Sequence, residues 1–443
     1  MLVARPHALM TNMETAPQRN AKPDSLIPIR VASRAVPGPQ LKLSRTPGEP
    51  PVEKRINTPR RPNVRMGKGS LERLGFTRAI NAGGHITLYG GSCPDPRVLK
   101  AMDEASARWA DMRVLEEGAG RLLASYLGCE DGFVTSGAYA ANAMAAQAAL
   151  ALAKERRRVG SPNIVIQACH VTKYAESFVT GGIALKEVTR GSESESLAEH
   201  IDGSTVAVAY VVNEADFEFT LRETVDACRE RGVPALVDAA VVDPAVRGIK
   251  EVLSYSPDSV SVSGGKSFNG PNATGLLLGK AGFVERARGL SFPNYGPGRG
   301  MKVSKEQIAG LLKAVELAAT ADEERVVDEW RKRADEVRGA VSGIPHVRAE
   351  VVFPWRLNFP QPVPRVAIFI ETPDGEAMAE EAKRRLAGGD PPVFVRPTND
   401  VVKAKNALTL DIRTVRQGEF RVLEESLRAV LSAVTKRGAP AAR

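Results

Sequence analysis

Lys266 and Asp238 are the residues of this chain whose type and setting could carry chemistry. Lys266 follows the short β-branched run 259–263 and two glycines, which let the backbone pass close to a ligand. Asp238 lies 28 residues before the lysine and closes an apolar run that begins at Pro234. A lysine amine can hold a carbonyl cofactor as a Schiff base, and a carboxylate can keep a ring nitrogen protonated so that the ring accepts electrons. The pair therefore predicts covalent catalysis through a ring cofactor that carries a carbonyl group.

A phosphate site is the third expected feature. Ser136, Gly137 and Ala138 join a strand pattern to the start of a long alanine-rich helix. The free N–H groups and the dipole of a helix N-terminus favour an anion, and the Ser136 hydroxyl adds a donor. Ser263, three residues before Lys266, offers a second hydroxyl. A phosphate loop, an acid and a lysine in this order are the layout of a pyridoxal phosphate enzyme of the aspartate-aminotransferase fold, so we expect pyridoxal 5'-phosphate as the cofactor.

Two histidines are further candidates for the site. His170 follows the strand pattern 163–167 and lies between the phosphate loop and the acid in the sequence. Enzymes of this layout place a flat side chain against the ring face at that point, so we expect His170 to stack on the cofactor. His85 lies in the glycine-rich segment 80–91 and is a candidate for the substrate site.

Cationic side chains in the second half of the chain could bind the anionic parts of a substrate. Arg413 ends a strand pattern, where a bidentate guanidinium could clamp an α-carboxylate. Arg396 is the alternative clamp. The loop 296–305 holds Arg299, Lys302 and a third cation among glycines. This composition suits a cofactor or substrate phosphate, including one in a neighbouring subunit.

Strand and helix patterns alternate after residue 130, and this order predicts an α/β fold. The run 205–212 is apolar throughout, as in a strand of a parallel sheet that is covered on both faces. We expect a large cofactor-binding domain at 70–315 with a mostly parallel, seven-stranded sheet. A smaller α+β domain at 316–443 should follow, and a long helix over 304–342 should link the two.

The net charge of +9 lies in the N-terminal segment. Residues 1–69 hold 13 Lys and Arg against 4 Asp and Glu, and 11 of the 30 prolines. The remaining residues carry 48 basic and 48 acidic side chains, so the expected folded body is neutral. A basic, proline-rich segment without apolar periodicity predicts a disordered tail. We interpret it as a solvated extension, or as sequence ahead of a true start at Met66; a polyanion-binding arm and a targeting peptide are the alternatives.

Composition also argues against other classes of protein. No run of 18 apolar residues occurs, which argues against a membrane span. The four cysteines contain no C-x-x-C pair, which argues against a structural zinc site and against a disulfide framework. We therefore expect no metal and a reducing, cytoplasmic location. The cysteines are Cys93, Cys129, Cys169 and Cys228.

The chain resembles one branch of the pyridoxal phosphate superfamily, the family that joins bacterial selenocysteine synthase (L-seryl-tRNA selenium transferase) with D-glucosaminate-6-phosphate ammonia-lyase. The segments 80–84, 236–240, 263–271 and 298–306 carry the likeness, and the last of these is the most distinctive. The segment 169–172 is closer to the ammonia-lyase. The resemblance covers about residues 74–320 well, and it implies fold type I and the cofactor. The stretch after Tyr174 is shorter than in an ammonia-lyase, and the basic tail lacks the character of the tRNA-binding domain of the selenium enzyme.

These features favour a lyase that abstracts the α-proton of an amino acid or amino-sugar acid and eliminates a β-substituent, giving a 2-oxo acid and ammonia. β-Replacement, racemisation and retro-aldol cleavage use the same motifs and are the enzymatic alternatives. A protein of this fold that binds nucleic acid or protein through its basic tail is the alternative of another class, and joint retention of the lysine, acid and phosphate loop argues against it. We expect a small amino acid substrate and at least a homodimer, because sites of this fold usually lie at a subunit boundary.

Overall fold

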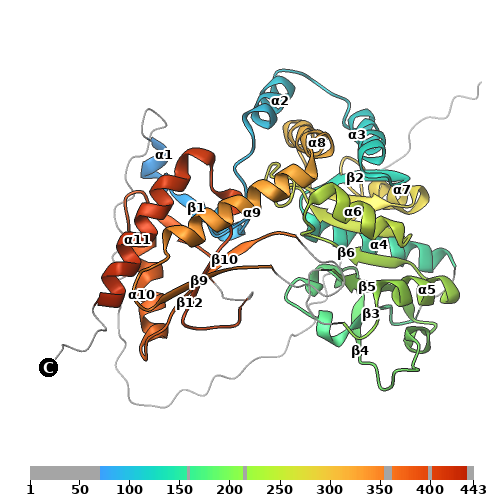
Figure 1. Ribbon diagram of the computed structural model, residues 1–443. Coiled ribbons are helices and arrows are strands. Elements are labelled where there is room, and N and C mark those ends of the chain that lie inside the picture. Colours follow the sequence, from blue (N-terminus) through green and yellow to red (C-terminus); the bar gives the residue numbers. More distant parts are fainter. Residues whose placement is uncertain (1–69, 157–159, 213–216, 354–361, 398–401, 437–443) are drawn as a thin grey trace, which may run out of the picture. The chain divides into compact units, whose positions relative to one another are not determined.

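The computed structural model describes residues 70–156, 160–212, 217–353, 362–397 and 402–436 (Figure 1). The predicted tail at 1–69 lies outside the described residues. The described helices and strands form two groups, each with a sheet and hydrophobic core of its own.

A seven-stranded sheet is the centre of the larger group. In spatial order its strands are β2 (Asp131–Thr135), β8 (Gly275–Gly279), β7 (Ser259–Ser263), β6 (Ala235–Asp238), β5 (Thr205–Val211), β3 (Asn163–Gln167) and β4 (Ala184–Val188). β8 is antiparallel to both of its neighbours, and the other adjacent pairs are parallel. The predicted α/β class with a mostly parallel, seven-stranded sheet is confirmed.

Helices cover both faces of this sheet. They are α2 (Pro96–Ser106), α3 (Met112–Leu127), α4 (Ala138–Glu155), α5 (Leu221–Arg231), α6 (Ala245–Ser254), α7 (Ala281–Gly289) and α8 (Lys305–Ala319). Val208 and Tyr210 of β5 pack in the core that contains α3, α5, α6 and α8, whereas Ala207 and Ala209 pack in the core that contains α4 and α7. This alternation explains why the strand is apolar at every position. The shorter helices are α1 (Ser70–Arg73), η1 (Thr87–Tyr89), η2 (Ala168–His170), η3 (Ala175–Phe178) and η4 (Leu197–His200).

The second group is a smaller α+β assembly. Its antiparallel sheet consists of β9 (Val347–Val352), β10 (Arg365–Ile370) and β12 (Ala407–Leu410), with β10 in the middle. A parallel pair joins β1 (Ile80–Ala82) to β11 (Val393–Val395). The helices are α9 (Glu323–Ala340), α10 (Gly375–Ala387), α11 (Phe420–Lys436), η5 (Ile412–Thr414) and η6 (Gln417–Glu419).

Two details differ from the sequence-based expectation. The helix expected over 304–342 is divided into α8 and α9, because the Asp322 side chain accepts the N–H of Arg325 at 3.1 Å and caps a new helix. The strand β1 precedes the large sheet in the sequence but pairs with β11. Its residues Ile80 and Ala82 are buried in the core of the smaller group, so this segment belongs to that group although it precedes the large sheet in the sequence.

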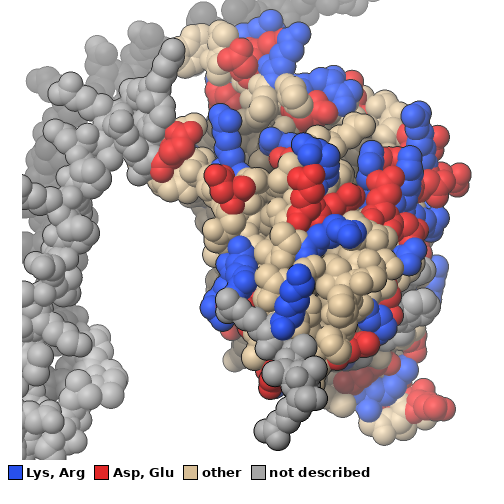
Figure 2. All heavy atoms as spheres, turned by 60° about the vertical axis from the view of Figure 1, so that its left-hand side comes forward, with Lys and Arg blue, Asp and Glu red and all other residues tan. Residues whose placement is uncertain are grey.

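The surface agrees with the balanced charge of residues 70–443. Figure 2 shows Lys and Arg side chains interspersed with Asp and Glu on the face that it draws. Among the described helices, none combines the length and the apolar character needed to cross a membrane.

Candidate active site

The expected site residues gather at one edge of the seven-stranded sheet. β2, β7, β6, β5 and β3 all run in the same direction, because the antiparallel β8 separates β2 from β7. Their C-terminal ends therefore carry Ser136, Ser263, Asp238 and, through η2, His170 at one edge. Ligands of open α/β sheets bind at this edge.

Asp238 is the buried acid of this edge. Its side chain accepts the Nδ2–H of Asn142 at 2.8 Å and the N–H of Ala240 at 2.9 Å. Burial raises the pKa of Asp238, and the Asn142 bond, the Ala240 bond and the positive charge of Lys266 act against that rise. The residue is 5% exposed. Such a carboxyl group is shielded from bulk water but has donors that favour its ionised form.

Lys266 lies in the turn after β7, and its chain neighbours explain the two glycines. A Cβ on Gly264 would lie 2.3 Å from Oγ1 of Thr274, and one on Gly265 would lie 2.6 Å from Cα of Asn272. The turn is closed by the N–H of Asn269, which donates to the carbonyl oxygen of Lys266 at 2.8 Å. The glycines therefore let the turn pack against the segment 272–274 of the same chain, and this contact fixes where the lysine leaves the sheet.

The loop between β2 and α4 has the features of an anion site. Gly137, the N-cap of α4, has φ of 120°, a conformation that side chains rarely adopt. Among the described residues, no side chain caps this helix, and apart from Gly137 and its two chain neighbours none has a heavy atom within 4 Å of where a Cβ of Gly137 would stand. Below the loop, Gly275 of β8 lets the backbone of Gly137 and Ala138 come close, since its Cβ would lie 2.4 Å from the Gly137 carbonyl carbon. Ser136 is half-buried beside it, and Ser263 is 8% exposed at the end of β7.

His170 is more enclosed than the sequence indicates. The residue is 0% exposed, and its Nδ1 accepts the N–H of Val211 at 3.2 Å. Its ring meets the ring of Tyr210 edge-on, with centroids 4.7 Å apart and planes at 87°. These contacts fix the imidazole at the end of β5, next to the strand that carries Asp238. Stacking of His170 on a cofactor stays a prediction.

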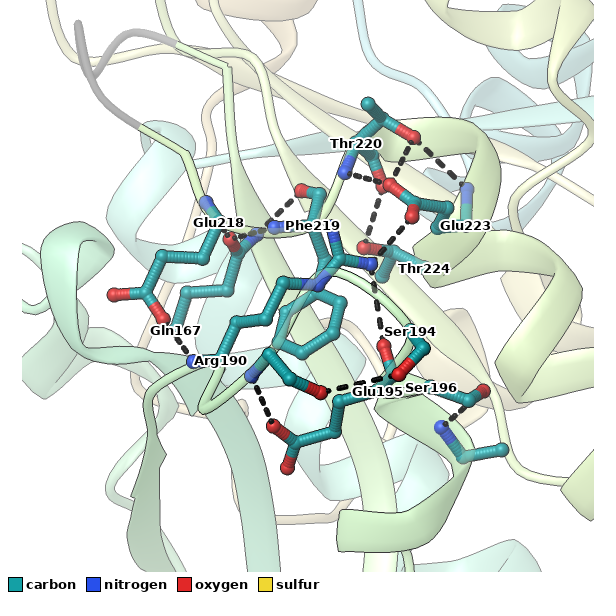
Figure 3. Close-up of polar contacts among 12 residues, drawn as sticks. Gln167, Arg190, Ser194, Glu195, Ser196, Glu218, Phe219, Thr220, Glu223 and Thr224 are labelled. Atoms are coloured by element: carbon teal, nitrogen blue, oxygen red, sulfur yellow. Dashed lines mark hydrogen bonds and ion pairs between the residues drawn. The ribbon is translucent and has the colours of Figure 1, made fainter.

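A polar network holds the strand ends beside His170 (Figure 3). Oε1 of Gln167 accepts the N–H groups of Glu218 and Phe219, both at 2.7 Å, and its Nε2 donates to the Phe219 carbonyl oxygen at 3.0 Å. Arg190, which follows β4, lies over the Phe219 ring at 4.3 Å and pairs with Glu223 at 2.5 Å. The network ties the ends of β3 and β4 to the start of α5, and so supports the edge that carries His170.

The sequence indicated a substrate carboxylate as the partner of Arg413, but in the structure its side chain pairs with two aspartates. Its guanidinium pairs with Asp243, from the loop after β6, and with Asp411 at 2.7 Å. Burial alone would lower the pKa of Arg413, but the charges of the two aspartates raise it. Asp411 also pairs with Arg365 at 3.1 Å. Two buried arginines and two buried aspartates thus neutralise one another between the two groups of elements.

His85 lies beside this ion cluster. Burial lowers its pKa to about 4, with the charge of Arg413 as the next cause, so the imidazole is neutral near pH 7. The nearby Asp411 and Asp243 act in the opposite direction. The alternative clamp, Arg396, donates through Nη1 to the carbonyl oxygen of Gly83 at 3.4 Å. Gly83 lies two residues before His85.

The three cations of the loop 296–305 have separate environments. The guanidinium of Arg299 lies over the rings of Phe292 and Tyr295, at 5.0 and 5.5 Å from their centroids. Lys302 is exposed. Lys305 donates to the carbonyl oxygens at the C-terminal end of α2, at 2.8 and 3.1 Å, so it serves helix packing. Arg299 and Lys302 stay as the predicted phosphate ligands of this loop.

Asn142 is a site residue that sequence reasoning missed. It lies one turn into α4, is 2% exposed, and bonds both Asp238 and Ser177. A short amide among alanines, one turn after the start of the predicted phosphate-binding helix, was the available signal.

No protein-family model matches this chain, but enzymes that are similar to it over most of its length include the following two. D-glucosaminate-6-phosphate ammonia lyase of Salmonella typhimurium (strain 14028s / SGSC 2262) is 25% identical over 382 residues, which cover 82% of this chain and 98% of that protein. 5'-C-glycyluridine monooxygenase-decarboxylase of a Streptomyces species is 28% identical over 352 residues, which cover 75% of this chain and 86% of that protein.

Solved structures show the same fold. A structure of D-glucosaminate-6-phosphate ammonia-lyase matches with a TM-score of 0.69 and 24% identity, over 85% of this chain and all of that one. A serine palmitoyltransferase of S. paucimobilis with a bound PLP–myriocin aldimine matches with a TM-score of 0.53 and 17% identity, over 80% of this chain and 88% of that one. These likenesses confirm the predicted fold and the resemblance to the ammonia-lyase.

Proposed function

We propose that this chain, which is a pyridoxal phosphate-dependent enzyme of fold type I, is a lyase that abstracts the α-proton of an amino-sugar acid or related amino acid and eliminates its β-substituent. The observation that carries the proposal is the similarity to an ammonia lyase over 82% of the chain. The same chain has Asp238 and the phosphate-type loop at one edge of the sheet, and Lys266 in the turn after β7. The products would be a 2-oxo acid and ammonia.

The residues at this edge fit the cofactor. An uncapped N-terminus of the 18-residue helix α4, with open space beside Gly137, suits a phosphate group. A buried carboxyl group with donors that favour its ionised form suits a protonated ring nitrogen. Ser136, Gly137, Ala138 and Ser263 would hold the phosphate, Asp238 would hold the ring proton, and His170 would pack on the ring. When bound, pyridoxal phosphate withdraws electrons from the α-carbon of the amino acid.

Lys266 would act twice in this scheme. Its amine would bind the cofactor covalently between turnovers, and after the substrate takes that place the free amine would accept the α-proton. The positive charge that Asp238 keeps on the ring would make the proton easier to remove, because a positive charge stabilises developing negative charge. After the β-substituent leaves, return of the Lys266 amine to the cofactor would release the product as an enamine, which would hydrolyse in water to a 2-oxo acid and ammonia.

The names of the two relatives support a substrate class. D-glucosaminate 6-phosphate is an amino acid on a sugar-acid chain, and 5'-C-glycyluridine joins a glycyl group to a nucleoside. Both carry an amino acid group beside a hydroxylated, sugar-derived part. We therefore infer a substrate with such a side chain, and Arg299, Lys302 and His85 are the side chains we assign to its recognition.

The second relative favours a second candidate function. A chain that is 28% identical to a monooxygenase-decarboxylase over 75% of its length could remove the α-carboxylate with consumption of O₂ in place of β-elimination. The two reactions are separated by incubating the cofactor-loaded protein with D-glucosaminate 6-phosphate and with 5'-C-glycyluridine. We expect a 2-oxo acid and ammonia without O₂ uptake or CO₂ release. CO₂ release with O₂ uptake would support the second function. A racemised substrate, glycine with an aldehyde, or a sulfur-substituted product when sulfide is added would support racemisation, retro-aldol cleavage or β-replacement, respectively.

We also propose that the chain is at least a homodimer with shared sites. The loop 296–305 combines glycines and cations, and Tyr295 beside it is 90% exposed in the single chain. An exposed aromatic side chain over an arginine suits a contact with a second copy.

A further inference from the structure

Asn142 links the start of α4 to the buried acid. It lies four residues after Ala138, the first residue of α4, and is 2% exposed among alanines that are themselves buried. Its Nδ2 donates to Oδ2 of Asp238 at 2.8 Å. A buried polar side chain is destabilising unless it is hydrogen-bonded; the Nδ2 group of Asn142 has partners, whereas its Oδ1 has none among the described residues.

A second bond fixes the amide. The same Nδ2 group donates to Oγ of Ser177 at 3.0 Å, and that hydroxyl donates to the Tyr174 carbonyl oxygen at 2.7 Å. Ser177 is 1% exposed in η3. The Asn142 amide therefore cannot rotate without loss of one of its two bonds, and Asp238 receives its hydrogen in a fixed direction.

Within the part of the chain that the structure describes, few other groups favour the ionised form of Asp238. The side chain accepts one further bond, from the N–H of Ala240 at 2.9 Å, and the charge that acts on it is that of Lys266 in the turn after β7. Burial opposes the Ala240 bond and the Lys266 charge. It is the largest influence, and it raises the pKa of Asp238. A hydrogen bond to a charged group is among the strongest single contacts a buried carboxylate can have.

We propose that Asn142 is a positioning residue that orients the Asp238 carboxylate and favours its ionised form. α4 would then set both ends of the cofactor, since its N-terminus receives the phosphate and its second turn holds the acid. This inference rests on the proposed function for the role of Asp238 toward the ring, but the Asn142–Asp238 bond itself can be tested without turnover.

The test is the unfolding of the full-length chain in denaturant at several pH values, measured without cofactor. Asn142→Leu removes the donor and keeps a similar volume. The pKa of Asp238 is raised, so the folded state disfavours the ionised carboxyl group. The resulting loss in the free energy of unfolding is absent below the unfolded pKa and is complete once the pH has risen through the folded pKa. Loss of the Asn142 bond should raise that pKa further, so the unfolding constant of the variant, relative to wild type, should be about 10- to 100-fold larger at pH 8.5 than at pH 5.

Gln147→Leu is the matched control. Gln147 lies on the same helix, is 8% exposed, and has Thr180 Oγ1, at 3.2 Å, as its hydrogen-bond partner in place of Asp238. Its effect should be the same at both pH values. An equal loss at pH 5 and pH 8.5 for Asn142→Leu as well would overturn the proposal and leave Asn142 as a packing residue.

Asn142→Asp covers the case in which the leucine variant does not fold. It keeps the shape of the side chain and places a second carboxylate beside Asp238, so its stability should fall more steeply than that of wild type above about pH 5 and recover in acid. Stability no more pH-sensitive than wild type would refute the proposal.

Activity of the loaded enzyme separates this proposal from the proposed function. For Asn142→Leu, we expect kcat to fall about 10- to 100-fold with little change in KM. If the pH-dependent stability loss is present but kcat is unchanged for both Asn142→Leu and Asp238→Asn, the bond is real and the assigned role of Asp238 toward the ring is wrong.

Discussion

Removal of the Arg413 guanidinium should destabilise the folded chain before it affects substrate binding. The Arg413 side chain is 6% exposed, and the side chains of Asp243 and Asp411 are 2% and 0% exposed. Breaking a buried ion pair at one partner costs about 3–5 kcal/mol, because an unpaired charge is left in the interior. Asp411 keeps Arg365 at 3.1 Å, so the loss falls mainly on Asp243. We therefore expect Arg413→Ala to lower the free energy of unfolding by about 3 kcal/mol, the lower end of that range.

A double-mutant cycle measures this contact directly. Arg413→Ala, Asp243→Ala and the double variant would be unfolded in urea and followed by far-UV circular dichroism. If the two side chains act as a pair, the double variant should be more stable than the sum of the single losses predicts, with a coupling energy of about 2–3 kcal/mol. Arg348→Ala is the control, because its pair with Glu371 is 47% and 51% exposed and should contribute little.

The opposite result would restore the role that the sequence indicates for Arg413. A clamp for the substrate carboxylate has its partner only when substrate is bound. Arg413→Ala would then leave the free energy of unfolding within about 0.5 kcal/mol of wild type and raise KM strongly. That outcome would refute the interpretation of the ion cluster as a tie between the two groups of elements.

Three further predictions follow from the site. Lys266→Ala should abolish the lysine adduct that borohydride reduces, and with it the absorbance band of the Schiff base between the lysine and the cofactor, while far-UV circular dichroism stays unchanged; an adduct on another lysine would show that the attachment site is misassigned. If sites are shared, mixing inactive Lys266→Ala chains with inactive Arg299→Ala chains should restore part of the activity, whereas an active monomer in light scattering would rule out sharing. The pKa of His85 is lowered to about 4 from its ordinary value of 6.5, so on acidification the unfolded chain takes up this proton first. The free energy of unfolding should therefore fall between pH 6.5 and pH 4. His85→Gln should remove that part of the fall, and an unchanged pH profile would contradict the lowered pKa.

The local parts of the fold could be predicted because each depends on nearby residues. The unbroken apolar run at 205–212, the apolar run before Asp238 and the glycine pair before Lys266 mark strand, acid and turn within a few residues. The break at Asp322 was also local, but a helix-permissive composition on both sides concealed it. An N-cap aspartate competes with continuation of the helix, and that competition is decided by packing that the sequence does not display.

Long-range pairings were the part that the sequence could not supply. Asp243 is 170 residues from Arg413, and nothing in the composition of either segment marks the other as its partner. The glycines before Lys266 show the same limit. Their small size indicated a close approach, but the approaching group is the segment 272–274 of the same chain rather than a ligand.

The alanine content of α4 gains a physical reason from the Asn142 contact. Ala141, Ala145 and Ala148 lie on the face that packs in the core beneath the sheet, and their small side chains let a helix approach its neighbours closely. A short amide can then reach Asp238, 96 residues away in the sequence, at 2.8 Å. Larger side chains on this face would lift the helix from the strands and break that bond, and they would also move the loop that precedes Ala138. The same close packing therefore determines the position of the acid's donor and of the proposed phosphate site.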